Sequence, residues 1–242
     1  MERTKAVRSK RSRRLKPKQT QFAFPNGWGG LRAGSGRKLR GERSSVPHRR
    51  RAPFAYRVPA EVTLRVRAGL PSLRRPLEFA VLRGAFARGC DHTGFRLVHF
   101  SVQTNHVHLI AEGDCRTSLT RGLQGLAIRM ARALNRLWRR SGRVFADRFH
   151  DRILRSPREV WFALRYVLCN ARKHGAWTSR TRHDPFSSAP WFNGWREVRP
   201  APEGASPTAP ARTWLLRKGW RFLGLMSLCD VPARPRPEGP NR

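Results

Sequence analysis

The chain has 242 residues, and its 51 Lys and Arg against 15 Asp and Glu give a formal net charge of +36. Such a charge repels itself in an isolated protein and indicates a polyanionic partner, of which nucleic acid is the obvious candidate. The sequence has no apolar run near the roughly 20 residues needed to span a bilayer and no apolar signal core at its start. We therefore expect a cytoplasmic, nucleoid-associated protein with no membrane contact.

Residues 1–56 are predicted to form a basic arm and connector. Residues 1–51 hold 17 Lys or Arg and only two acids, Glu2 and Glu42, with few aliphatic side chains. Such a segment cannot bury a core, so we expect it to be largely disordered when free. Its glycine-rich basic run around Trp28 suits either contact with phosphates or a flexible linker.

Residues 57–176 alternate strand and helix signals. An alternating pattern at 62–66 predicts a strand, and Pro76 suits the first position of a helix that runs to about Arg88. Two β runs, 95–102 and 106–112, are separated by three polar residues, which favours an antiparallel hairpin. The inner side of the first helix is expected to carry Leu77, Val81, Leu82 and Phe86.

The clearest helix follows the hairpin, where apolar residues recur at spacings of three and four and Gly142 marks the end. Its apolar residues are Leu119, Leu123, Leu126, Met130, Leu134 and Leu137, and Arg121, Arg129, Arg132, Arg136 and Arg139 decorate its other faces. These arginines suit a solvated surface or phosphate contacts equally. Residues 149–154 then predict a further strand.

The last helix of this region has a capping box of Ser156 and Glu159, and Gly175 is its natural stop. Tyr166 and Asn170 are four residues apart, so their side chains share one helix face. Because Tyr56 lies in the connector, Tyr166 is the only plausible phenol nucleophile in the folded part.

His106 and His108 are the most informative pair in the chain. Side chains alternate along a strand, so both imidazoles project from one face and can converge on one cation. A helix laid across this strand would assemble two ring nitrogens, the Asn170 amide oxygen and the Tyr166 phenol around a metal. The four Cys are scattered without a CxxC pair, so we expect free thiols.

The segment Asn105-His106-Val107-His108-Leu109, followed by the leucine helix and then by residues 165–172, resembles the single-tyrosine HUH transposases, especially the REP-associated tyrosine transposases. The resemblance covers 57–176. It implies an α+β fold in which helices flank a ferredoxin-like antiparallel sheet. It also implies that His106, His108 and Asn170 bind Mg²⁺ or Mn²⁺ and that Tyr166 is the nucleophile.

The activity implied by this resemblance is cleavage and rejoining of single-stranded or hairpin DNA through a 5′-phosphotyrosine, by a monomer or a homodimer. A phenol has an ordinary pKa of about 10, and nearby arginines would favour the phenolate. The residues expected to contact DNA are Arg121, Arg129, Arg132, Arg165 and Arg172.

Residues 177–230 form a Trp-rich extension, and 231–242 read as a disordered tail. The tryptophans suit core packing or stacking on DNA bases. Two rival functions remain open. One is a hairpin-binding protein without catalysis, and the other is a zinc-stabilised nucleic-acid-binding module that uses the two histidines with Cys115. The tryptophans of the extension are Trp177, Trp191, Trp195, Trp214 and Trp220.

Overall fold

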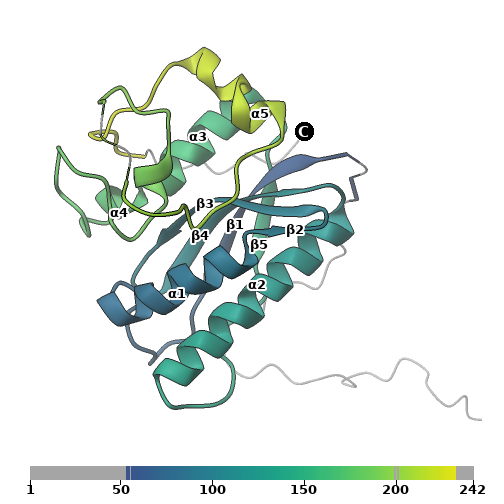
Figure 1. Ribbon diagram of the computed structural model, residues 1–242, viewed down its shortest axis with the longest axis vertical. Helices are drawn as coiled ribbons and strands as arrows, with labels where there is room; N and C mark the ends of the chain where they lie inside the picture. Colours follow the sequence, from purple (N-terminus) through teal and green to yellow (C-terminus); the bar gives the residue numbers. More distant parts are fainter. Residues whose placement is uncertain (1–52, 55, 199, 201, 233–242) are drawn as a thin grey trace, which may run out of the picture. The chain divides into compact units, whose positions relative to one another are not determined.

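A computed structural model describes residues 53–54, 56–198, 200 and 202–232 (Figure 1). The arm predicted for residues 1–51 and most of the predicted tail, 233–242, lie outside these residues. No helix within the described part of the chain combines the length and the apolar character that a membrane span requires.

A five-stranded antiparallel sheet with the order β2-β3-β4-β1-β5 forms the centre of the fold. Without the short β2, the chain runs β1-α1-β3-β4-α2-β5, with β4 between β3 and β1, and this is the ferredoxin-like order. The α+β fold predicted from the sequence is confirmed. The strands are β1 (Val58–Arg65), β2 (Asp91–His92), β3 (Phe95–Val102), β4 (His106–Gly113) and β5 (His150–Ile153).

Helices α1 (Pro76–Gly89) and α2 (Arg116–Leu137) pack together over one face of this sheet (Figure 1). Strand alternation sends Val107 and Leu109 of β4 to this face, where they join the apolar side chains of both helices in the larger core. The predicted spacing of the α2 leucines is confirmed, because the residues that bury are Leu119, Leu123, Leu126, Met130 and Leu134.

The opposite face of the sheet carries α3 (Pro157–Leu168) and the segment that follows it. Ile110 of β4 and Val98 of β3 pack against the apolar side of α3, in a second core. His106 and His108 are in phase with Ile110, so they lie on this same face. The segment also contains α4 (Asn170–Lys173), η1 (Ala189–Trp191), α5 (Trp214–Arg217) and η2 (Gly219–Leu223).

Two buried carboxylates attach the carboxy-terminal segment to the sheet. Glu112 of β4 accepts hydrogen bonds from the backbone N–H groups of Arg212 and Thr213 and from the Thr213 hydroxyl, at 2.6 to 2.8 Å. Asp184 accepts two hydrogen bonds from the guanidinium of Arg74, at 2.8 and 2.9 Å. These contacts fix α5 and the loop before η1 over the same face as α3.

Three details of the sequence prediction are wrong. The first strand begins at Val58 rather than at residue 62, because Val58 and Ala60 continue the inward-facing series. Leu77 is 68% exposed, since the inner face of α1 runs through Glu78, whose buried carboxylate accepts from the Trp138 ring N–H. The predicted helix to Gly175 is interrupted at Cys169, where φ of −106° and ψ of 11° leave the helical range.

Candidate functional site

The imidazoles of His106 and His108 converge on each other, as the strand alternation predicts. Their Nε2 atoms lie 2.9 Å apart, and their rings are nearly perpendicular, with centroids 4.6 Å apart. Two nitrogens at right angles around a cation, each at about 2.1 Å, are separated by about 3 Å. The pair therefore has the spacing of adjacent ligands of one metal ion.

The other nitrogen of each ring is held by an oxygen. His106 donates from Nδ1 to the Asn105 amide oxygen at 2.9 Å. Nδ1 of His108 lies 3.1 Å from the hydroxyl of Thr63, which stands directly opposite on β1 and can accept its hydrogen. Such contacts orient metal-binding histidines and leave the Nε2 lone pairs facing inward.

Both histidines are neutral at neutral pH. Burial lowers the pKa of His106 to about 4, with smaller contributions from His174 and Arg65. Burial also lowers the pKa of His108 to about 3, helped by the charges of His106, His174 and Lys173. The neutral imidazole is the form that binds metal, so this burial keeps the pair in its ligand state.

Tyr166 lies in the last turn of α3, and its ring meets the His108 ring edge-on, with the centroids 4.9 Å apart. Asn170, the first residue of α4, is fully buried, and neither of its amide atoms has a hydrogen-bond partner in the described part of the chain. An unpaired buried amide is costly unless a ligand satisfies it. An amide oxygen and imidazole nitrogens are groups that suit a divalent cation.

The sequence missed two residues at this site, Lys173 and His174. The ammonium of Lys173 lies 4.9 Å from the centroid of the Tyr166 ring, and the His174 ring lies 6.2 Å from that of His106. Both belong to the short turn that follows the interruption at Cys169. Lys173 and His174 are seven and eight residues after Tyr166, so the helical spacing that groups Tyr166 with Asn170 could have found them.

The phenol is less acidic than an exposed tyrosine. Burial raises the pKa of Tyr166, and the charge of Glu61 raises it further. The Asn170 amide, which is near the phenol but outside normal hydrogen-bond geometry, partly offsets this. The expectation that nearby arginines favour the phenolate is wrong for Arg165 and Arg172, because their guanidinium groups are directed elsewhere.

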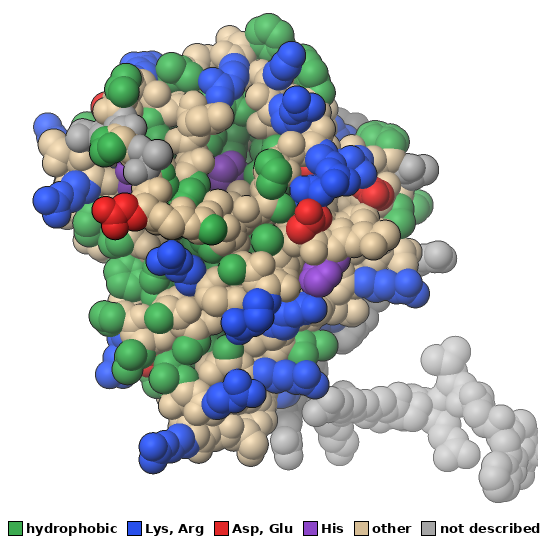
Figure 2. Space-filling view, in the orientation of Figure 1, with side chains coloured by type: hydrophobic (Ala, Val, Ile, Leu, Met, Phe, Trp, Pro, Cys, Tyr) green, Lys and Arg blue, Asp and Glu red, His purple; other side chains and the backbone are tan. Residues whose placement is uncertain are grey.

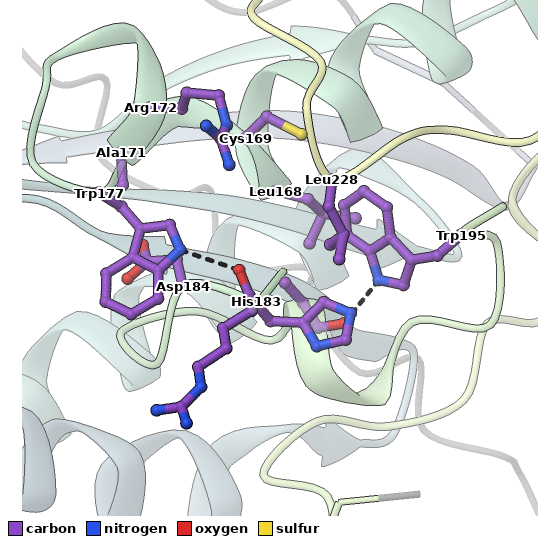
Figure 3. Close-up of a pocket in the computed structure, with 11 residues that line it drawn as sticks. Leu168, Cys169, Ala171, Arg172, Trp177, His183, Asp184, Trp195 and Leu228 are labelled. Atoms are coloured by element: carbon purple, nitrogen blue, oxygen red, sulfur yellow. Dashed lines mark hydrogen bonds between the residues drawn. The ribbon is translucent and has the colours of Figure 1, made fainter. Parts of the chain in front are cut away.

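Arg165 lies over the Trp161 ring, at 5.4 Å, and donates to the Val231 carbonyl at 2.9 Å. Arg172 donates to the carbonyls of Thr178 and Ser179. Figure 3 shows Arg172 beside Cys169 at a small cavity of about 20 Å³. The cation near the phenol is therefore Lys173.

The other predicted DNA-contacting residues are not brought to this site. Arg121 and Arg132 are exposed and Arg129 is half-buried on α2, which covers the opposite face of the sheet from His106 and His108. They are available to solvent there. Because these arginines lie across the sheet from the histidine pair, any contact they make with DNA would be remote from Tyr166.

The zinc-module reading finds no support in the geometry. Cys115 caps the amino terminus of α2, beyond Gly113 and thus at the far end of β4 from His106. Within the described ranges, no three His, Cys, Asp or Glu side chains gather in a way that could hold a metal.

No family model matches the chain, and no curated protein does. A solved structure of a REP-associated tyrosine transposase bound to a REP hairpin is similar to it, with 17% identity and a TM-score of 0.49. The match covers 59% of this chain and 82% of that one. A likeness at this level transfers no residue roles, so the roles considered below rest on the geometry of the chain itself.

Proposed function

We propose that this protein is a metal-dependent, transposase-like endonuclease and strand transferase that acts on single-stranded DNA carrying hairpins or palindromic repeats. The observation that carries the proposal is the position of the Tyr166 ring, 4.9 Å from the ring of His108, whose Nε2 converges with that of His106. A phenol beside paired neutral imidazoles suits phosphoryl transfer to tyrosine, because the imidazoles can hold a metal ion next to the nucleophile.

In this reaction the Tyr166 hydroxyl loses its proton, and its oxygen attacks a backbone phosphorus and forms a phosphotyrosine with the 5′ phosphate of the downstream fragment. The bond from phosphorus to the 3′ oxygen breaks, and the 3′-hydroxyl leaves with a proton. A later 3′-hydroxyl attacks the phosphotyrosine, rejoins the strand and releases the phenol. One phosphodiester replaces another at each step, so no nucleotide hydrolysis is needed.

His106, His108 and Asn170 would hold Mg²⁺ or Mn²⁺, which polarises the scissile phosphate and offsets the charge that develops on its oxygens. Thr63 and Asn105 hold the two imidazoles in the orientation that this binding needs. Lys173 places a positive charge near the phenol and would favour loss of its proton.

The charge of the molecule supports a DNA substrate. Lys and Arg side chains spread over the visible face of the protein, with few Asp or Glu between them (Figure 2). A polyanion gains affinity from such a surface through release of its counterions. Guanidinium groups also make bidentate contacts with phosphates.

The proposal is tested by incubating the protein with labelled hairpin DNA and Mn²⁺ and resolving the products on a denaturing protein gel. The expected result is a covalent adduct that Tyr166→Phe abolishes. Tyr56→Phe is the matched control, because Tyr56 is 66% exposed in the connector, and it should leave the adduct unchanged. An adduct formed by Tyr166→Phe would refute the assignment of Tyr166 as the nucleophile. Tight binding by the wild type without any adduct would favour the hairpin-binding protein without catalysis.

A further inference from the structure

A second site lies on the same face of the sheet, in a cavity of about 450 Å³ between β3, η1 and α5. This volume falls in the range of about 300 to 1,000 Å³ that is typical of small-ligand sites. Figure 2 shows the surface hollowed in its upper part, with a histidine inside the hollow. The mechanism proposed above makes no use of this cavity.

Aromatic rings form much of the wall. Phe192 meets the ring of His99 edge-on, with centroids 5.3 Å apart, and Trp191 also lines the cavity. Nδ1 of His99 lies 3.2 Å from the Ser188 hydroxyl, which fixes the ring. Burial lowers the pKa of His99 to about 4, so the imidazole is neutral. These walls suit a flat ring.

Polar groups line the rest of the cavity and include no acid. The Asn193 amide oxygen accepts from Arg221 at 2.8 Å, which leaves its NH₂ group as a donor. Thr208 contributes a hydroxyl, and Arg217 of α5 is exposed and makes no hydrogen bond or ion pair through its side chain with the described residues. A ring with hydrogen-bonding edges and an attached anion matches this lining.

The strand register sets the distance to Tyr166 and its histidines. His99 stands opposite Ile110, and Ser101 stands opposite His108. His99 therefore lies on the strand next to His108, displaced by two residues along the strand direction. This places their Cα atoms about 8 Å apart. This is close to the length of one extended nucleotide, so neighbouring nucleotides of one strand could occupy both sites.

We propose that this cavity binds one unstacked base of single-stranded DNA, with Trp191, Phe192 and His99 around the ring and Arg217 at the phosphate. The inference rests on the proposed function only in taking DNA as the ligand. Stacking on aromatic side chains contributes to binding whatever the base, because each base has a flat face. The cavity would thus hold the strand in place next to the nucleophile.

The test is binding rather than cleavage, and it uses the full chain carrying Tyr166→Phe, in EDTA. Fluorescence anisotropy compares a short oligothymidylate with a fully abasic strand of the same length. Thr208→Trp fills the cavity, and Thr181→Trp is the control, because both threonines donate their N–H to a Ser hydroxyl two residues earlier, outside any helix or strand.

Thr208→Trp should weaken oligothymidylate binding about tenfold and leave the abasic strand within about twofold, while Thr181→Trp changes neither. Arg217→Glu is a second variant, with Lys218→Glu as its control of equal charge on the same exposed turn, and the Arg217 change should weaken binding more. Equal losses for both strands with Thr208→Trp, or equal losses for both members of either pair, would overturn the inference. Adduct formation at Tyr166 would then still stand, so the two proposals can fail separately.

Discussion

The Nε2 atoms of His106 and His108 lie 2.9 Å apart, with the opposite nitrogens held by Asn105 and Thr63. Two neutral imidazoles with inward lone pairs repel at this distance unless a proton or a cation lies between them. A hydrogen on one Nε2 joins the two rings in the metal-free protein, and a bound metal ion would take its place.

Loss of a ligand should therefore abolish metal binding, and loss of its support should weaken it. We expect His108→Ala to remove measurable Mn²⁺ binding by calorimetry. Thr63→Val keeps the shape of the side chain but removes the oxygen beside Nδ1, so affinity should fall about 10- to 100-fold. His92→Ala, an exposed histidine on β2, is the control. Unchanged affinity in His108→Ala would remove the histidine pair from the metal site.

Adjacent residues of α4 should differ in their effect on cleavage. Lys173 lies over the Tyr166 ring, whereas Arg172 donates to loop carbonyls. Lys173→Met should slow single-turnover cleavage about tenfold at fixed pH, because it removes the positive charge that lies over the Tyr166 ring. Arg172→Met should leave that rate nearly unchanged. A larger loss for Arg172→Met than for Lys173→Met would assign the activating charge to the arginine.

The four cysteines should differ in reactivity. Burial raises the pKa of Cys169 to about 12, whereas hydrogen bonds from Ser118 lower the pKa of Cys115. Because the thiolate is the nucleophile, iodoacetamide at about pH 8 should label Cys115 and spare Cys169 until the protein unfolds. Peptide mass spectrometry reads this directly, and rapid labelling of Cys169 in the folded protein would show that it is not buried.

The raised pKa of Cys169 also makes the stability of the protein depend on pH. The folded pKa of Cys169 exceeds the ordinary value of 9.0, so its contribution is fully present below pH 9 and is lost as the pH rises towards about 12. Cys169→Ala should reduce the alkaline loss of stability, measured by urea unfolding over this pH range. An identical alkaline loss in the variant would show that other groups cause it.

The buried pair of Arg74 and Asp184 should matter more than an exposed pair. Asp184→Asn leaves a buried guanidinium without its partner charge, which costs about 3 to 5 kcal/mol. Asp114→Asn, at the solvent-screened pair with Arg57, should cost less than about 1 kcal/mol. Urea unfolding measures both, and equal losses would show that Asp184 does not anchor the segment before η1.

Much of the fold follows from local patterns in the sequence. The leucine spacing of α2 and the capping box of Ser156 and Glu159 correspond to observed elements, because each depends on neighbours within a few residues. The shared face of His106 and His108 also follows from strand geometry alone. Local rules therefore sufficed for α1, α2 and the start of α3, for the hairpin and for the histidine pair.

Other features depend on how distant segments dock. The direction of the Arg165 and Arg172 side chains is set by Val231 and by the loop after α4, which no local pattern places. The contact of Glu112 with the start of α5 joins residues a hundred positions apart, so tertiary packing decides it.

The most direct test of the account is to locate the covalent bond between protein and DNA. The adduct formed with labelled hairpin DNA and Mn²⁺ is digested with a protease and a nuclease, and the modified peptide is sequenced by tandem mass spectrometry. We predict a nucleotide linked through its 5′ phosphate to Tyr166. A linkage to Tyr56, to a serine or to any other residue would contradict it.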